Sequence, residues 1–97
     1  MVKHIILWKL KDECNTAAVK AGIKAGLEGL AGKIPGLVEI SVQNEGLASS
    51  NADVMLYSVF TDEAALRGYA VHPLHVEVAD TLVRPFTATR LCLDFEV

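Results

Sequence analysis

Apolar positions recur along this chain with two different periods, which separate the expected strands from the expected helices. Residues 2–10 are rich in β-branched and aromatic types, a composition that favours a strand. His4 and Trp8 fall on one face of this strand, and Ile5 and Leu7 fall on the other. Because both faces carry large apolar side chains, both are expected to be covered.

A helix is predicted next, capped by Asn15 or Thr16 and ended by Pro35-Gly36. Its apolar positions recur at the three- and four-residue spacing of a single buried stripe: Val19, Ile23, Leu27, Leu30 and Ile34. Glycines inside this segment weaken a helix by roughly 1 kcal/mol each relative to alanine, so packing must hold it in place.

Two further strands are predicted in the middle of the chain. Residues 37–42 alternate Val38, Ile40 and Val42 with polar positions, the pattern of a half-buried strand. After a polar loop, residues 52–60 are apolar on both faces, like the first strand.

The last part of the chain predicts a broken helix followed by a strand. Thr61 is expected to cap the helix, and Pro73 must interrupt it between Val71 and Leu74, because proline lacks a backbone donor and restricts the residue before it. Helical spacing then resumes until Arg84-Pro85, and residues 87–97 form a fourth strand.

This order, β-α-β-β-α-β over residues 1–97, predicts one α+β domain with the ferredoxin-like arrangement. Its four-stranded antiparallel sheet would carry both helices on one face. The other face is expected to be apolar, with Ile5, Leu7, Met55, Tyr57 and Val59. Such a surface in water favours association, so we expect a homodimer in which two sheets pack face to face, a dimeric α/β barrel.

Composition narrows the function without identifying it. The chain has 97 residues, of which 52% are hydrophobic, and its net charge of −3 offers no attraction for nucleic acid or an anionic membrane. No stretch is long enough to span a bilayer. Cys14 and Cys92 form no Cys-x-x-Cys pair, so reduced thiols and a cytoplasmic location are expected.

The segment around Pro73 holds the candidate chemistry. Imidazole titrates near neutrality and a phenol can donate a proton, so His4, Tyr69, His72 and His75 could line a cavity, with His75 as base and Tyr69 as donor. In the alternative interpretation, His72 caps the broken helix, His75 forms a hydrogen bond to the first strand, and Tyr69 fills core. The expected ligand contacts include His72 and Trp8.

The same histidines are also candidate metal ligands. His72-x-x-His75 has a ligand-like spacing, and His4 could supply a third nitrogen. Pro73 makes the local backbone non-helical, however, and no acidic residue stands at an obvious ligand position. The sequence therefore predicts no metal site and no cofactor.

Several segments resemble the stress-responsive dimeric α/β-barrel (Dabb) family: Val2-Lys3-His4-Ile5, Trp8-Lys9, Ile34-Pro35-Gly36, Tyr69 and His72-Pro73-x-His75. The resemblance implies ferredoxin-like subunits that dimerise through their sheets. A plant polyketide cyclase in this family is an enzyme, and its catalytic tyrosine and histidines would correspond to Tyr69, His75 and His4. Val54 stands where that cyclase has a further histidine, so the resemblance adds Val54 to the expected ligand contacts. Some relatives hold a cation on backbone carbonyls, which would correspond to Ala31, Ile34 and Leu37.

Two functional classes follow from this reading. The first is a stress-related binding module that holds a small apolar or carbonyl-containing molecule near the His-Pro-x-His segment. The second is a small cofactor-free enzyme, similar to a polyketide cyclase acting by aldol chemistry or enolisation, or to a monooxygenase.

Overall fold

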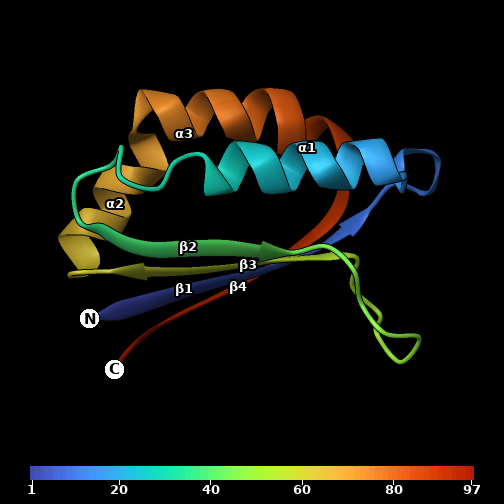
Figure 1. Cartoon of the computed structure of the whole chain (residues 1–97). Coiled ribbons are helices and arrows are strands. Elements are labelled where there is room, and N and C mark those ends of the chain that lie inside the picture. Colours follow the sequence, from blue (N-terminus) through green and yellow to red (C-terminus); the bar gives the residue numbers. More distant parts are fainter.

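The computed structural model describes the whole chain, Met1–Val97, as a four-stranded antiparallel sheet covered by helices on one face (Figure 1). The strands lie side by side in the order β2-β3-β1-β4, with bounds β1 Val2–Leu10, β2 Leu37–Gln43, β3 Val54–Phe60 and β4 Thr87–Glu96. This order confirms the predicted ferredoxin-like α+β fold.

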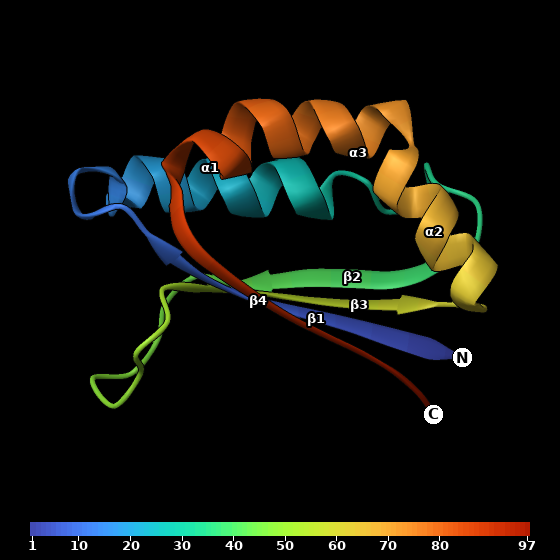
Figure 2. The ribbon, with the colours of Figure 1, turned by 180° about the vertical axis from the view of Figure 1, so that it is seen from behind.

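The helical layer consists of three α-helices and a few short turns. Figure 2 shows α1 and α3 next to each other above the sheet, with α2 at one end. The bounds are α1 Ala17–Glu28, α2 Glu63–Val71 and α3 Pro73–Val78; a π-helical turn over Ala79–Val83 continues α3, and 3-10 turns cover Asp12–Cys14 and Arg84–Phe86. No helix has the length and apolar character needed to cross a membrane.

The hydrophobic core lies between the sheet and this helical layer. Alternate residues of β1 point into it, so Ile6, Trp8 and Leu10 are buried, as their spacing predicts. From the helices they meet Ile23 and Leu27, both on the predicted stripe of α1.

Helix α1 is shorter than the apolar spacing predicted. It begins after its cap Thr16, whose hydroxyl accepts a hydrogen bond from the Val19 amide, and it ends at Glu28. The expectation that it continues to Pro35 was wrong. Gly29 follows the last helical residue and Gly32 has a φ of +75°, a conformation outside any right-handed helix. Leu30 and Ile34 are nonetheless buried, from the turns that follow.

A β-bulge interrupts the predicted alternation of β2. The pairing register with β3 shifts between Leu37 and Glu39, so Val38 is left without a partner and is 52% exposed. After the bulge, Ile40 is half-buried and Val42 is fully buried, as predicted. The expectation that Val38 belongs to the buried face was wrong for this reason.

Two other element starts differ from the predictions by one or two residues. β3 begins at Val54 and not at residue 52. Asp62, and not Thr61, caps α2, because its carboxylate accepts a hydrogen bond from the Ala65 amide at 2.8 Å. A carboxylate in this position also faces the positive end of the helix dipole.

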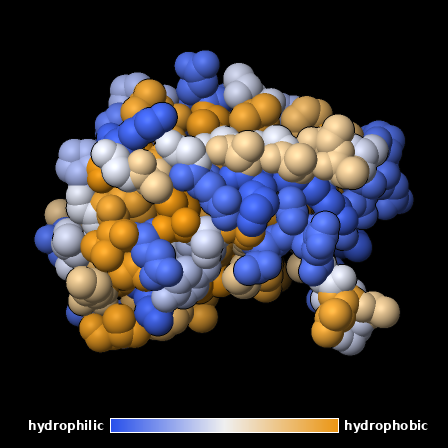
Figure 3. Space-filling view, viewed as in Figure 1, coloured by the Kyte–Doolittle hydropathy of each residue, from blue (hydrophilic) through white to orange (hydrophobic).

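The opposite face of the sheet has no helix over it and is apolar. Ile5, Met55 and Tyr57 are partly covered by their neighbours, and Val59 is buried. β4 adds three exposed side chains that pair in register with this face, Leu91, Leu93 and Phe95. In Figure 3, apolar surface gathers at the lower left, towards the two chain ends.

Candidate functional site

A single extended residue separates α2 from α3. His72 has φ −64° and ψ 132°, and its Nδ1 accepts a hydrogen bond from the Leu74 amide at 3.1 Å, which caps α3. Pro73 occupies the first position of that helix, where its missing donor costs nothing. The predicted break is therefore present, and the His72 ring caps α3 as the alternative interpretation proposed.

The turn at His72 directs α3 back over the sheet and leaves a cavity of about 150 Å³ between the layers. The side chains that line it and carry polar atoms or aromatic rings are His4, Trp8, Tyr69, His75, Arg84 and Arg90. The Tyr69 ring centroid lies 4.2 Å from that of His75 and 6.1 Å from that of His4. The three predicted catalytic side chains, His4, Tyr69 and His75, thus line the same cavity.

The hydroxyl group of Tyr69 is buried without a partner. The residue is 1% exposed, and its Oη atom has no hydrogen bond. Burial raises the pKa of this phenol, so it stays protonated and can donate. A buried hydroxyl without a partner is uncommon and costs about 1 to 3 kcal/mol, so it calls for an acceptor that the protein itself does not supply.

His75 is held as a neutral imidazole. Its Nδ1 donates to the backbone carbonyl of Ala70 at 3.2 Å, which leaves Nε2 as the basic nitrogen. Burial lowers the pKa of His75, and the nearby charges of Arg84, His4 and Arg90 lower it further, against the opposing effect of the Ala70 bond. A half-buried neutral imidazole next to a phenol has the properties of a general base.

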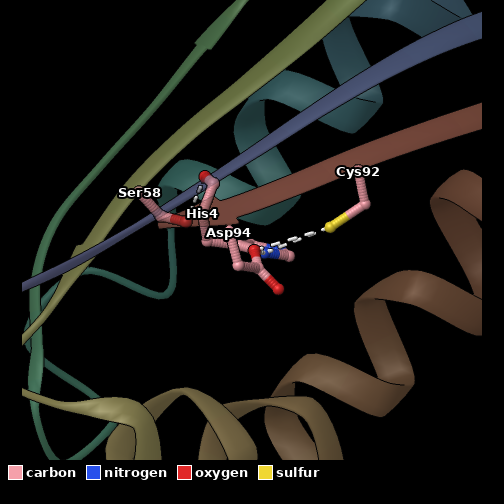
Figure 4. A network of polar contacts seen from close by, with 4 residues as sticks. All are labelled: His4, Ser58, Cys92 and Asp94. Carbon is pink, nitrogen blue, oxygen red and sulfur yellow. Dashed lines mark hydrogen bonds and ion pairs between the residues drawn. The ribbon is translucent and has the colours of Figure 1, made fainter. Parts of the chain in front are cut away.

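His4 forms the wall between this cavity and the outer strand β4. Its imidazole is buried, and Nδ1 makes a short hydrogen bond to the carboxylate of Asp94 (Figure 4). Its backbone carbonyl accepts a bond from the buried Ser58 hydroxyl at 3.0 Å. Cys92 lies beside the pair, its Sγ 3.7 Å from Nδ1 of His4.

Asp94 and Cys92 were not among the predicted site residues. They lie on β4, 90 and 88 residues after His4 in the sequence. One feature of the sequence could have placed them on a common face. Leu91, Leu93 and Phe95 alternate along the predicted strand, so the residues between them, Cys92 and Asp94, must share the opposite face.

The remaining predicted ligand contacts divide between the cavity and other places. Trp8 lines the cavity and is 4% exposed, so it also belongs to the core. Val54 pairs with Trp8 across the strands but is buried outside the cavity lining. His72 is also absent from that lining. The structure brings His4, Trp8, Tyr69 and His75 together, and it leaves His72 and Val54 outside the group.

A wider, open groove of about 790 Å³ lies beside the cavity, between α2 and β4. The groove and the cavity share His4, Leu66, Ala70 and Arg90 in their walls. Asp94 and Cys92 line the groove, and Glu63 and Arg67 of α2 face them across it. The groove therefore gives the His4 pair contact with solvent.

Fold and site together define a ferredoxin-like α+β subunit with a partly enclosed cavity, lined by Tyr69 and His75, under a broken helix. The chain belongs to the Dabb family, the stress responsive A/B barrel domain, whose model matches residues 2–97. No curated protein matches the chain.

Solved structures share this fold over nearly the whole chain. A dimeric protein of unknown function with a ferredoxin-like fold from Bacteroides fragilis is 31% identical, with a TM-score of 0.90 over 99% of this chain and 95% of that one. A dimeric ferredoxin-like protein of unknown function from Thermobifida fusca is 26% identical, with a TM-score of 0.87 over 99% and 90%. The hydroxynitrile lyase from Passiflora edulis shares the fold alone, at 17% identity and a TM-score of 0.80 over 97% and 90%.

Proposed function

We propose that this protein binds a small molecule with a carbonyl or hydroxyl oxygen in the cavity between Tyr69, His75 and His4. The observation that carries the proposal is the buried Tyr69 hydroxyl, which lacks a hydrogen-bond partner. An oxygen atom of the ligand would accept this hydrogen bond and remove the cost of leaving the donor unpaired.

The volume and lining of the cavity limit the ligand. A cavity of about 150 Å³ is the size that holds a benzene-sized molecule. Apolar side chains dominate the lining, while Arg84 and Arg90 add positive charge at its edge. A small aromatic or branched carbonyl compound, neutral or weakly acidic, fits these properties.

A second candidate function is catalysis of proton transfer on the same ligand. Neutral His75 has a free basic nitrogen, and Tyr69 stands beside it as a donor. With a carbonyl oxygen held by Tyr69, the base would remove the proton on the adjacent carbon while the phenol stabilises the developing oxyanion. This enolisation needs no cofactor. The fold alone does not indicate which reaction takes place, since the hydroxynitrile lyase from Passiflora edulis has the same fold.

The proposal includes a homodimer in which the open faces of two sheets meet. The apolar side chains on β1, β3 and β4 support it, and relatives with this fold are described as dimeric. A cytoplasmic location, inferred from two cysteines that form no disulfide, remains part of the same proposal.

Acetophenone is a suitable probe because it is small and aromatic and has exchangeable protons next to its carbonyl. Binding would be measured by ligand-observed NMR, and enolisation by deuterium uptake at the methyl group. We expect Tyr69→Phe to abolish binding, and His75→Gln to retain binding but lose exchange. Cys14→Ser, which alters a residue outside the cavity, should change neither. Acetophenone binding that is equal in the parent and Tyr69→Phe would disprove the assignment of the carbonyl to Tyr69.

A further inference from the structure

His4, Cys92 and Asp94 converge on one point at the wall of the open groove. Asp94 lies directly opposite His4 in the antiparallel pairing of β1 and β4, and Cys92 is two residues away on the same face of β4. Figure 4 shows all three side chains pointing away from the sheet towards the space beside the helices. One nitrogen, one sulfur and one oxygen, all potential metal ligands, lie within 4.8 Å of one another.

Two of the three spacings among these atoms, the two that involve the sulfur, match the edges of a tetrahedral metal site. Zinc lies about 2.3 Å from a thiolate and about 2.0 to 2.2 Å from imidazole nitrogen or carboxylate oxygen, which places sulfur about 3.6 Å from each of the other two ligands. In the structure, Cys92 Sγ is 3.7 Å from Nδ1 of His4 and 3.5 Å from Oδ1 of Asp94. Both distances from the sulfur therefore agree with those of a tetrahedral site.

We propose that His4, Cys92 and Asp94 form a site for a divalent transition-metal ion of the zinc class. The ligands would be His4 Nδ1, Cys92 Sγ and Asp94 Oδ1. This mixture of thiolate, imidazole and carboxylate suits zinc and cobalt, whereas magnesium and calcium prefer oxygen ligands alone. Three protein ligands leave a fourth position free, as in catalytic and exchangeable zinc sites, and here it faces the groove.

Only a small rearrangement separates the structure from the metal-bound geometry. The hydrogen bond between His4 Nδ1 and the Asp94 carboxylate would open on binding, and the ion would take the place of the proton between them. The Asp94 side chain is 42% exposed and can rotate to make this space. His4 stays in place, because its ring is buried and its backbone carbonyl is bonded to Ser58.

The charges around the site are balanced. Arg67 and Arg90 bring positive charge to the groove, and Glu63 and Glu96 bring negative charge. Glu63 forms an ion pair with Arg67 at 3.7 Å, so part of the positive charge facing the cluster is compensated. The thiolate and carboxylate would neutralise the two charges of the bound ion.

The proposed ligands differ from the set that the sequence spacing suggests, which is His4, His72 and His75. In the structure, Nδ1 of His72 is used to cap α3, and Nδ1 of His75 donates to Ala70. Nδ1 of His4 is instead hydrogen-bonded to Asp94 on β4. The ligands therefore come from strand pairing and not from a short sequence spacing.

Cobalt(II) is the direct probe, because a thiolate ligand gives an intense charge-transfer band and tetrahedral geometry strengthens the visible bands. We would titrate the full chain with cobalt(II) under reducing conditions and then displace it with zinc. The expected result is one ion per chain with both spectral features. Cys92→Ser should remove the charge-transfer band, and Asp94→Asn should weaken binding by at least about tenfold.

The chain supplies a matched control in its other cysteine. Cys14→Ser should leave the spectrum and the affinity unchanged, because Cys14 is outside the cluster. A thiolate band that survives in Cys92→Ser, or no cobalt binding by the parent, would overturn the proposal. Cys92→Ser should also keep acetophenone binding, and Tyr69→Phe should keep cobalt binding, so the metal site and the proposed cavity function can fail separately.

Discussion

Tyr69 and His75 lie with their ring centroids 4.2 Å apart and their planes tilted by 36°, although they belong to different helices. In one continuous helix, side chains three or four positions apart are neighbours, and a separation of six places them on different faces. The extended backbone of His72 removes this restriction. The break at His72 and Pro73 therefore brings the Tyr69 and His75 rings together, which a continuous helix would not do.

The first prediction concerns the pH dependence of stability, which His75 should influence. Its pKa is lowered from 6.5 in the folded protein, mainly by burial, so the unfolded state binds more protons as the solution is acidified. The contribution of His75 to the free energy of unfolding should be fully present above pH 6.5, and it should be lost as the pH drops towards the pKa of His75 in the folded protein. His75→Gln should flatten this decline below pH 6.5 in urea denaturation.

The charges that face His75 are Arg84, His4 and Arg90, and all of them oppose its protonation. His72→Gln serves as the control, because His72 is absent from the cavity lining, and this variant should leave the decline in place. A decline of equal size in the parent and in His75→Gln would show that other groups produce the acid sensitivity.

A second prediction concerns Trp8, which fills space both in the core and along the cavity. Trp8→Ala should lower the free energy of unfolding by about 3 to 5 kcal/mol, because a large buried side chain leaves a void that the core closes only in part. Trp8→Phe should cost less, since more of the volume is kept. Urea denaturation of the three proteins measures the difference, and a small loss for Trp8→Ala would contradict the structural role.

A third prediction compares two glycines. Gly36 has a φ of +80°, and a β-carbon there would lie 3.0 Å from the Thr61 hydroxyl oxygen, so Gly36→Ala should destabilise the protein by about 1 to 3 kcal/mol. Gly68, inside α2, has open space around the corresponding position. Gly68→Ala should therefore be neutral or add up to about 1 kcal/mol. Thermal unfolding of both variants tests the contrast, and equal effects would refute it.

The spacing of apolar residues predicted the sheet and the helical layer of this protein well, because the residues on the buried face of a strand or helix recur at a fixed period. The strand over residues 2–10, the order of elements and the break before Pro73 all follow from local rules. Glycine and bulge effects explain the main local errors: α1 ends at Glu28, and Val38 lies outside the ladder. Both depend on backbone conformations that apolar spacing does not encode.

The candidate site was predictable only in part. Tyr69 and His75 stand close to the proline that signals the break, so the sequence places them near each other. Asp94 and Cys92 meet His4 only because β4 pairs with β1 in one particular register. A shift of one residue would turn both side chains to the opposite face, and no local pattern decides that register between segments so far apart.

The last prediction tests the homodimer through Met55, on the face of the sheet that has no helix. Met55 pairs with Leu7, which pairs in turn with Leu91 of β4, so the three form one apolar row across the open face. In a dimer of packed sheets, a carboxylate at this row would be buried without a partner, at a cost of several kcal/mol. Light scattering should therefore show a dimer for the parent at micromolar concentration and a monomer or insoluble protein for Met55→Asp. Val71→Asp places the same charge on an exposed residue of α2, and it should remain dimeric. A monomeric parent, or a Met55→Asp variant that stays fully dimeric, would show that the sheets do not form the interface.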